Sequence, residues 1–300
     1  MTVVGESRRH ADQGQGLIDG AVEDGLPLRE ARWILQHVDA ASPVGEDRPS
    51  AFHRLVARRQ AGEPLQYVLG SWPFRSLELL VDRRVLIPRP ETERVVEVAL
   101  HELTSVLEAT RGPGRVPTAV DLGTGSGAIA LSLAVEAGPR WPGLEVWATD
   151  RSDAALAVAA LNLEAASVRL ARAGVTVRLA RGHWWAALPE DCRGQLDLVV
   201  SNPPYVAEDE LADLDAGVRQ WEPESALVAR AGFAGVGGMA DIEVVVAGAA
   251  DWLRPGGALV VEIAPHQAGA ATAASRKAGF RQIRTEPDLT GRTRMLVAGR

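Results

Sequence analysis

Apolar and polar positions along the first sixty residues follow the period of an α-helix. The spacing predicts helices over residues 16–40 and 50–61, and Pro43 interrupts the pattern between them because proline cannot continue a helix. The first fifteen residues carry no pattern that predicts structure. Residues 1–70 are therefore expected to form a small helical domain.

Residues 71–115 show a different pattern. Apolar residues alternate over 72–88 with Asp82-Arg83 as a turn, which predicts a β-hairpin. Helical spacing returns over 92–107 and stops before the Gly-Pro-Gly sequence that follows. A hairpin and a connecting helix are therefore expected to link the helical domain to the rest of the chain.

From residue 116 to residue 300, short apolar runs alternate with helical segments. This alternation predicts a parallel sheet that is covered by helices on both faces. The expected strands lie near 118–122, 144–149, 175–180, 196–201 and 257–263, and the expected helices near 127–137, 153–165, 240–253 and 266–278. The last two segments, 282–286 and 295–298, are expected to close the sheet as an antiparallel hairpin.

Composition narrows the class of protein. With 300 residues and 46% hydrophobic content the chain can bury a large core, and its net charge of −7 argues against affinity based on phosphate neutralisation. The single cysteine, Cys192, excludes an intrachain disulfide and a multi-cysteine metal site, so no metal is expected. No apolar run approaches the length of a membrane span and the N-terminus has no hydrophobic signal core, so a cytoplasmic protein is expected.

A glycine-rich turn follows the first strand of the α/β region. Residues 117–130 read as a short apolar strand, glycines at alternate positions from Gly123 to Gly127, and the start of an apolar helix. Glycine permits a tight turn and lets the backbone approach a ligand closely, so this loop is expected to hold one. An ordinary turn or another nucleotide-binding fold is the alternative, because G-x-G-x-G alone is a weak motif.

Two carboxylates near this loop indicate which kind of ligand it would bind. Asp150 ends the second strand at about 20 residues after Gly127, the interval expected for an acid that accepts the ribose hydroxyls. The alternative role for Asp150 is to cap the following helix, although Ser152 or Asp153 could do so instead. Asp121 lies two residues before the first glycine, where a carboxylate would repel a pyrophosphate but suit a sulfonium or an ammonium group. S-adenosylmethionine carries both of these cations.

The most informative stretch is an apolar strand that runs into Asn202-Pro203-Pro204-Tyr205. Two prolines fix φ and supply no N–H, so the carbonyls around them can accept hydrogen bonds from a ligand. The Asn202 side-chain oxygen and the Pro203 carbonyl can accept the two N–H groups of a planar amide or amine, and Tyr205 can pack against it. A conjugated nitrogen that is held and polarised in this way can act as a nucleophile. A sharp polar turn after a strand is the alternative.

Four stretches give the chain a specific resemblance. They are GEPLQYVLG from Gly62, VLIPRPETE from Val85, DLGTGSG from Asp121 and SNPPY from Ser201, with weaker similarity at Leu253–Gly257, Glu262, Gln267 and Gly291–Arg294. On these residues the chain resembles the HemK/PrmC family, the N5-glutamine methyltransferases that modify the Gly-Gly-Gln loop of peptide-chain release factors. The resemblance implies a class I S-adenosylmethionine-dependent methyltransferase, with a Rossmann-like seven-stranded sheet that ends in an antiparallel hairpin and with a helical N-terminal domain that recognises the substrate.

The resemblance also implies roles for individual residues. The glycine loop would wrap the methionine end of the cofactor, Asp150 would hold the ribose, Trp184 would lie beside the adenine, and Asn202 would touch both cofactor and substrate. The implied cofactor-binding residues are Asp121, Gly123, Thr124, Gly125, Ser126, Gly127, Asp150, Trp184 and Asn202. The implied catalytic residues are Asn202, Pro203 and Tyr205, and Asn202, Pro203, Pro204, Tyr205 and Arg89 would bind the substrate.

Some positions depart from the family pattern or have a second interpretation. His183 stands where the family commonly has Asp, and Ala264 stands where glycine is usual. Arg89 lies between two prolines, so a stiff linker with Glu91 or Thr92 as a helix cap is the alternative to contact with the substrate.

The resemblance implies a release factor as the protein substrate, and S-adenosylhomocysteine as the product of the cofactor. The form of residues 88–93 favours this substrate over a ribosomal-protein glutamine, which close relatives in the family methylate. Adenine-N6 methylation of DNA or RNA is a further alternative, because the adenine amine is also planar and conjugated. A non-catalytic adenosyl-binding module is another, although it would need neither Tyr205 nor the two prolines. No direct nucleic-acid contact and no membrane contact are expected, and the protein is expected to act as a monomer.

Overall fold

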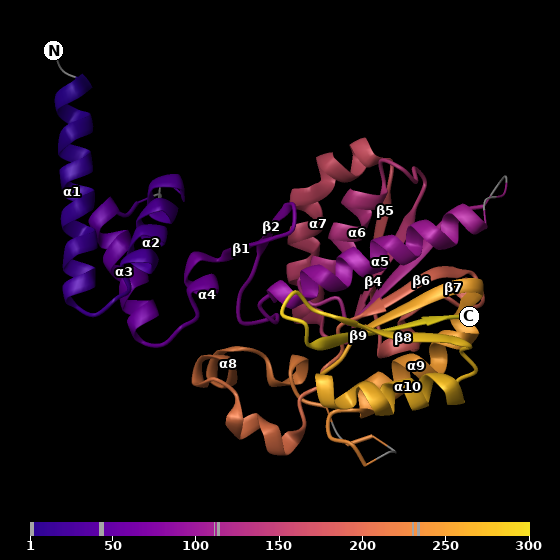
Figure 1. Cartoon of the computed structure of the whole chain (residues 1–300). Coiled ribbons are helices and arrows are strands. Elements are labelled where there is room, and N and C mark those ends of the chain that lie inside the picture. The colour runs from indigo at the N-terminus through magenta and orange to yellow at the C-terminus, as the bar shows by residue number, and fades with distance from the viewer. Residues whose placement is uncertain (1–2, 42–44, 111, 113–114, 230, 233–234) are drawn as a thin grey trace. The chain divides into compact units, whose positions relative to one another are not determined.

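The computed structural model describes residues 3–41, 45–110, 112, 115–229, 231–232 and 235–300. The chain divides into two compact units, Met1–Ser71 and Trp72–Arg300. The described part of the first unit is helical, and the second unit is built around a seven-stranded sheet (Figure 1).

The first unit contains helices α1 (Val3–Glu23), α2 (Leu28–Ala41), α3 (Arg48–Gln60) and α4 (Leu65–Leu69). Their apolar sides meet in a core that includes Ile34 and Phe52, both fully buried. The single helix expected over 16–40 is wrong, because the chain breaks between α1 and α2. Gly25 adopts a φ of 90° at the break, and Pro27 supplies no N–H. Helix α4 is too short for its apolar spacing to predict it.

The second unit begins with a two-stranded hairpin of β1 (Ser71–Phe74) and β2 (Leu77–Leu80). The hairpin turn lies at Arg75-Ser76, between β1 and β2, and not at Asp82-Arg83 as expected. A separate turn does occur at the expected place, after β2, where the Val85 N–H donates to the Asp82 carbonyl at 3.1 Å. Arg75 adopts a φ of 51°, and contacts with the sheet domain hold it there. Its guanidinium lies 2.6 Å from the Glu136 carboxylate, and its backbone N–H donates to Glu93 Oε1 at 3.0 Å. These partners are distant in sequence, and local pattern therefore did not reveal the turn.

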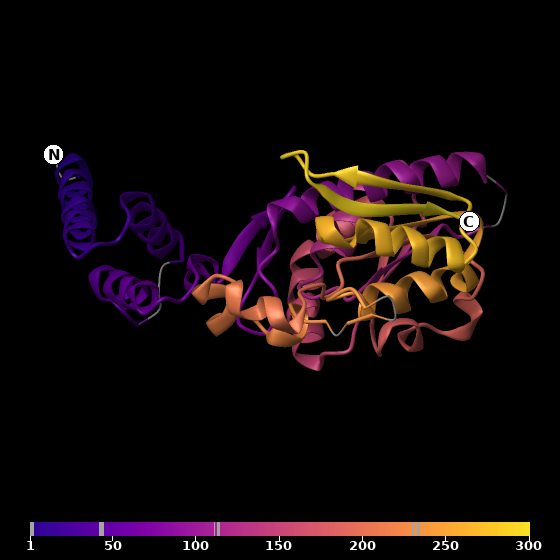
Figure 2. The ribbon, with the colours of Figure 1, turned by 60° about the horizontal axis from the view of Figure 1, so that its bottom comes forward.

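The large sheet has the order β5-β4-β3-β6-β7-β9-β8. Its strands are β3 (Thr118–Leu122), β4 (Glu145–Asp150), β5 (Thr176–Arg181), β6 (Leu196–Ser201), β7 (Leu253–Glu262), β8 (Gln282–Pro287) and β9 (Thr293–Gly299). Strands β3 to β7 pair in parallel, and β9 pairs antiparallel with both β7 and β8. Figure 2 shows this antiparallel pair at the edge of the sheet beside α10. The predicted parallel sheet with a closing hairpin is confirmed, and β7 begins earlier than expected.

Helices cover both faces of this sheet (Figure 1). One face carries α5 (Pro90–Ala109), α6 (Ala128–Ala137) and α7 (Asp153–Ala173), and the other carries α9 (Ala240–Trp252) and α10 (Ala268–Lys277). Shorter elements are α8 (Ala216–Trp221) and the 3-10 turns η1 (Trp184–Ala187), η2 (Glu190–Cys192), η3 (Glu208–Asp213), η4 (Glu224–Ala226) and η5 (Pro265–Gln267). The central strands β3 and β6 are buried at almost every position and are mainly apolar, as expected for strands covered on both faces.

Helix α5 starts two residues earlier than its apolar spacing suggested. Its first residue is Pro90 and its N-cap residue is Arg89, so the expected capping by Glu91 or Thr92 is wrong. Proline suits the first position because that N–H has no partner within a helix. Thr92 is thereby placed inside the first turn, with its hydroxyl free to bond elsewhere.

Helix α7 is long and apolar enough to cross a membrane by length and composition, the one such helix in the described part of the chain. The sequence had suggested that no apolar run approaches this length. In the structure Ala166, Leu170 and Ala173 pack into the core beneath the parallel strands. The helix runs to Ala173 rather than 165 and ends at Gly174, which has a φ of 66°.

The strand order reverses at β3, which places a crevice at the carboxyl ends of the central strands. Chain order runs outward from β3 through β4 to β5 on one side, and through β6 to β7 on the other. In register, Leu122 at the end of β3 pairs with Thr149 of β4 and with Ser201 of β6. The loops that leave these three strands therefore start side by side and diverge, as at other ligand sites of open α/β sheets.

Candidate active site

A cavity of about 390 Å³ lies at this edge of the sheet. Its volume is within the range of small-molecule sites, about 300–1,000 Å³. The lining brings together seven stretches of the second unit. They are Arg83–Leu86 with Pro88, Arg89 and Thr92; Gly123–Ser126 with Ala128 and Ile129; Thr149–Ser152 with Ala154 and Ala155; Gly182–Trp184; Asn202 with Pro204; Pro223 with Ser225 and Ala226; and Asp241. Both motifs singled out in the sequence thus contribute to one cavity.

The glycine loop turns sharply between β3 and α6. Gly123 has a φ of 78°, and its N–H and that of Thr124 both donate to the Thr149 carbonyl, at 2.9 and 2.8 Å. A Cβ at Gly123 would lie 3.4 Å from the Trp184 ring, so glycine here lets the loop backbone and the indole approach each other. The loop therefore forms one wall of the cavity with its backbone rather than with side chains.

Asp121 lies behind this loop and does not line the cavity. Its Oδ2 accepts hydrogen bonds from the Thr124 hydroxyl at 2.6 Å and the Ala130 N–H at 3.2 Å. Its Oδ1 has no hydrogen-bond partner among the described residues. Burial raises the pKa of Asp121 to about 7, and the Asp150 carboxylate adds to the shift. Asp121 thus shapes the loop, and direct contact with a cofactor stays a prediction.

Asp150 ends β4 and faces the cavity. Its Oδ2 accepts from the Gly125 N–H at 3.0 Å and its Oδ1 from the Ser152 N–H at 2.9 Å. Each carboxylate oxygen has a second lone pair, so both can still accept from ribose hydroxyls. The cap of α7 is Ser152, whose hydroxyl accepts from the Ala155 N–H. The alternative role as helix cap is therefore filled by another residue.

Trp184 lines the cavity together with Asp150. It adopts a φ of 49°, a conformation that non-glycine residues rarely take, and its indole N–H donates to Asp241 Oδ1 at 3.0 Å. His183 lines the cavity beside it, with the two rings edge to face at 5.8 Å. Asp241 also lines the cavity, and no local signal in the sequence indicates it.

The tetrapeptide leaves β6 with two residues in the cavity wall. Asn202 and Pro204 line the cavity, whereas Pro203 and Tyr205 face neighbouring elements. The Tyr205 hydroxyl donates to Glu262 Oε1 at 3.1 Å. Burial raises the pKa of Tyr205 above its ordinary value, with the Glu262 carboxylate adding to the shift, so the phenol stays neutral.

A glycine before α9 packs directly against the tetrapeptide. Gly238 has a φ of 71°, and a Cβ there would lie 2.0 Å from the Tyr205 carbonyl oxygen. The Gln267 side-chain N–H₂ donates to that same oxygen at 2.9 Å and to the Gly237 carbonyl at 3.0 Å. The backbone of the turn is therefore fixed by two segments that follow it in the chain.

Arg89 contacts a buried carboxylate from the segment after the tetrapeptide. Its guanidinium donates to Glu222 Oε1 at 2.6 Å, and the Ile87 N–H donates to Glu222 Oε2 at 3.0 Å. The Glu222 side chain is 1% exposed. Contact of Arg89 with the substrate stays a prediction, and Glu222 is a site residue that the sequence reasoning missed. No signal in the local sequence could have shown a pairing over 133 positions.

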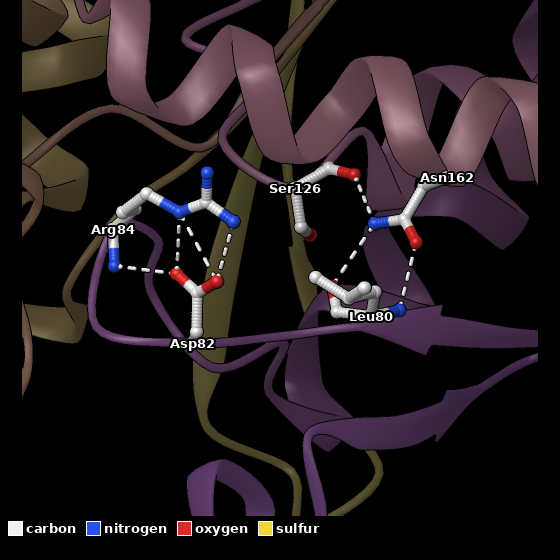
Figure 3. Close-up of polar contacts among 5 residues, drawn as sticks. All are labelled: Leu80, Asp82, Arg84, Ser126 and Asn162. Atoms are coloured by element: carbon white, nitrogen blue, oxygen red, sulfur yellow. Dashed lines mark hydrogen bonds and ion pairs between the residues drawn. The ribbon is translucent and has the colours of Figure 1, made fainter.

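A second missed residue is Asn162 on α7, drawn in Figure 3. Its Oδ1 accepts from the Leu80 N–H at 2.7 Å, and its Nδ2 donates to the carbonyls of Leu80 and Ser126 at 3.0 and 2.9 Å. Asn162 thereby ties the end of the hairpin to the glycine loop. Figure 3 also shows the ion pair between Asp82 and Arg84, in the segment that follows β2. Arg84 lines the cavity.

The cavity lining fits S-adenosylmethionine. Asp150 offers acceptors for the ribose, the Trp184 indole offers a surface for the adenine, and the backbone of the glycine loop lines the cavity for the methionine end. The buried Asp121, with an unpartnered oxygen behind the loop, favours a positive charge nearby. Asn202 lines the same cavity, where a methyl acceptor could meet the methyl donor.

The fold and the site together define a class I S-adenosylmethionine-dependent methyltransferase. Residues 96–217 match the family model of the methyltransferase small domain, and residues 21–70 match that of the PrmC N-terminal domain. The chain belongs to the release factor glutamine methyltransferase family. It is 41% identical over 286 residues to the protein of that name from Bordetella pertussis, covering 92% of this chain and 96% of the relative.

A second relative and a solved structure extend the comparison. The release factor glutamine methyltransferase of Salmonella typhimurium is 36% identical over 280 residues, which cover 90% of this chain and 91% of that protein. Among solved structures, a 16S rRNA methyltransferase (RsmC) of T. thermophilus in complex with AdoMet and guanosine aligns with a TM-score of 0.47. That alignment has 20% identity and covers 77% of this chain and 49% of the other.

Proposed function

We propose that this protein transfers a methyl group from S-adenosylmethionine to the side-chain N5 of the glutamine in the Gly-Gly-Gln motif of a peptide-chain release factor. Relatives that align over nine tenths of the chain carry that name. The observation that carries the proposal is that Asn202 and Pro204 line the same cavity as the glycine loop and Asp150. An amide bound at the tetrapeptide would therefore lie beside the methyl donor.

The tetrapeptide supplies the acceptors that an amide substrate needs. The nitrogen of a carboxamide shares its lone pair with the carbonyl and is a poor nucleophile until its N–H groups are held. The Asn202 Oδ1 and the Pro203 carbonyl would accept hydrogen bonds from these two N–H groups. The two bonds would orient the nitrogen and raise its electron density. Orientation of this kind lowers a barrier by about 7–11 kcal/mol in the best cases.

Bound S-adenosylmethionine would supply an activated methyl group on a sulfonium, held by Asp150, Trp184 and the glycine loop. The residues of the chain orient the acceptor and exclude water. The nitrogen becomes acidic once it is methylated, so it releases its proton after the transfer and needs no strong base beforehand.

Four arginines of the helical unit favour a protein partner over a nucleic acid. Arg48, Arg54, Arg58 and Arg59 each lie within ion-pair distance of an acidic side chain of the same unit. Their charges are thus balanced within the unit, whereas a nucleic-acid site needs cations that neutralise phosphates. We propose that residues 1–70 recognise the release factor and that residues 71–115 connect this domain to the catalytic domain of residues 116–300. We also propose that the protein acts as a monomer in the cytoplasm.

A competition assay tests the substrate. The enzyme is given radiolabelled S-adenosylmethionine with a release factor, a ribosomal protein that carries a comparable glutamine, and DNA, each alone and together. Label on the Gly-Gly-Gln peptide of the release factor is expected. Preferential labelling of the ribosomal protein, or of adenine in DNA, would contradict the proposal.

The variant Asn202→Ala tests the role of the tetrapeptide. We expect it to lose at least about 100-fold in turnover while it still binds the cofactor, since it lacks an acceptor used in the transition state. Gln195→Ala, which deletes an exposed amide before the start of β6, is the matched control and should keep normal turnover. Normal turnover of Asn202→Ala would refute the assigned role.

A further inference from the structure

A chain of four hydrogen-bonded side chains, the buried Thr92 and Glu262 and the half-buried Tyr205 and Asn202, ends at the amide of Asn202. Glu262, at the end of β7 and 1% exposed, accepts the Tyr205 hydroxyl on Oε1 and the Thr92 hydroxyl on Oε2, the latter at 2.8 Å. The Thr92 oxygen in turn accepts from Asn202 Nδ2 at 3.3 Å. These contacts join α5, β7 and the turn after β6, which are far apart in sequence.

We infer that Thr92 and Glu262 are positioning residues that hold the Asn202 carboxamide with its oxygen towards the acceptor amide. The inference rests on the proposed function and deepens it. The two ends of an asparagine amide are nearly equal in size, so shape alone does not select which end faces the cavity. A hydrogen-bonding partner has to make the selection.

Proton counting shows why this network can select the orientation. An ionised carboxylate carries no proton and can only accept, so both hydroxyls next to Glu262 must donate to it. A threonine hydroxyl has one proton, and at Thr92 that proton is committed to Glu262. The Thr92 oxygen can then only accept, which requires Asn202 to present its NH₂ group. Oδ1 is left on the other side, and no described residue donates a hydrogen bond to it.

The orientation of the Asn202 amide matters because the substrate nitrogen needs a hydrogen-bond acceptor. A glutamine side-chain nitrogen carries two donors, and a second donor from Asn202 could not hold it. If the Asn202 amide were rotated by half a turn, its NH₂ would face the substrate nitrogen and the acceptor would be lost. Thr92 and Glu262 would therefore affect turnover without touching the reacting atoms.

The same network makes turnover depend on pH. Burial raises the pKa of Glu262 to about 6, with Glu91 of α5 adding to the shift. Arg294 of β9 and the hydroxyls of Thr92 and Tyr205 act in the opposite direction. A proton on Glu262 could be donated to Thr92, whose own proton would then face Asn202 and favour the rotated amide. The productive orientation is therefore kept above about pH 6 and lost as pH falls through this value.

The composition of the chain allows a direct measurement. Its only asparagines are Asn162 and Asn202, so selective ¹⁵N-asparagine labelling of the whole protein gives two side-chain amide signals. In the wild type without substrate we expect the Asn202 Nδ2 signal to shift with a midpoint near pH 6, and the buried Asn162 signal to stay constant as an internal control. Thr92→Val should abolish the shift, and Thr92→Ser should retain it.

Kinetics with release factor and S-adenosylmethionine give the second readout. Thr92→Val, which keeps the shape and removes the hydroxyl, should lower kcat by about 10- to 100-fold with an unchanged Kd for the cofactor. Thr92→Ser should recover most of this loss. In the wild type kcat should fall about tenfold per pH unit below 6. Glu262→Gln should be slow at every pH, because the two hydroxyls donate to different oxygens of Glu262 and glutamine carries an NH₂ donor in place of one of them.

The outcomes separate the two proposals. An Asn202 signal that does not titrate in the wild type, or that is the same in Thr92→Val, overturns the inference whatever the substrate is. Equal loss of kcat in Thr92→Val and Thr92→Ser also overturns it, because that result indicates a packing role. If the predicted titration and its loss in Thr92→Val are found while the wild type does not methylate release factor, the orientation stands and the proposed substrate is wrong.

Discussion

Replacing Asn162 by alanine tests whether a single buried amide couples the hairpin to the cofactor loop. The substitution removes three hydrogen bonds, to both backbone groups of Leu80 and to the Ser126 carbonyl (Figure 3). Ser126 is buried and its carbonyl would lose this partner, whereas Leu80 is half-buried and water can replace part of the loss. The glycine loop would then be less firmly held at one end.

The size of the effect follows from these contacts. At a net value of about 1 kcal/mol for each hydrogen bond, the loss in free energy of unfolding is about 3 kcal/mol. The affected unit spans residues 72–300, and in a domain of this size each kcal/mol lowers the Tm by about 2–4 °C. We therefore expect the melting temperature to fall by about 6–12 °C.

Calorimetry and a cofactor titration measure the two consequences of Asn162→Ala. Differential scanning calorimetry gives the Tm, and isothermal titration with S-adenosylmethionine should show a Kd raised by about 5- to 10-fold, because the loop is less preorganised. Ser167→Ala, an exposed position on the same helix, is the control. A Tm within about 2 °C of the wild type would refute the reasoning.

Three further changes test other parts of the site. Glu222→Ala should cost about 2–3 kcal/mol and speed exchange of the Ile87 amide in NMR, whereas the exposed Glu224→Ala should change neither. Burial raises the pKa of Asp121 from 3.8 to about 7, so its contribution to stability is fully present below 3.8 and is lost as pH rises through 7. Asp121→Asn should remove this dependence, worth at most about 4 kcal/mol, and denaturant melts between pH 4 and pH 8 that match the wild type would contradict it. Trp184→Ala should raise the Kd for S-adenosylmethionine about tenfold with Trp184→Phe in between, and equal affinities would exclude stacking on the indole.

The parts of the fold that were predictable are those specified by local pattern. Short apolar strands that alternate with helices indicated the parallel sheet, and the glycine loop and the tetrapeptide marked the ends of β3 and β6. Both ends meet at the same cavity because parallel neighbours share one carboxyl edge. The cavity itself therefore followed from the order of strands and motifs.

The parts that were missed depend on partners far away in the chain. The hairpin turn at Arg75 is held by Glu93 and Glu136. The residues next to Arg75 in the sequence do not indicate that it adopts a left-handed conformation. Glu222 and Asn162 looked like ordinary polar residues of a loop and a helix, and their partners are 36 or more positions away. Local periodicity carries no information about such pairs.

The tight fit between Gly238 and the Tyr205 carbonyl has a consequence for transplanting the catalytic turn. Any side chain at position 238 would displace that carbonyl, and the displacement would change the orientation of Asn202 in the same turn. A different scaffold given the same four residues, but an alanine at the equivalent place, would carry the motif in its sequence and lack its geometry. Engineering this chemistry into a new host thus requires grafting a glycine from another strand connection together with the motif.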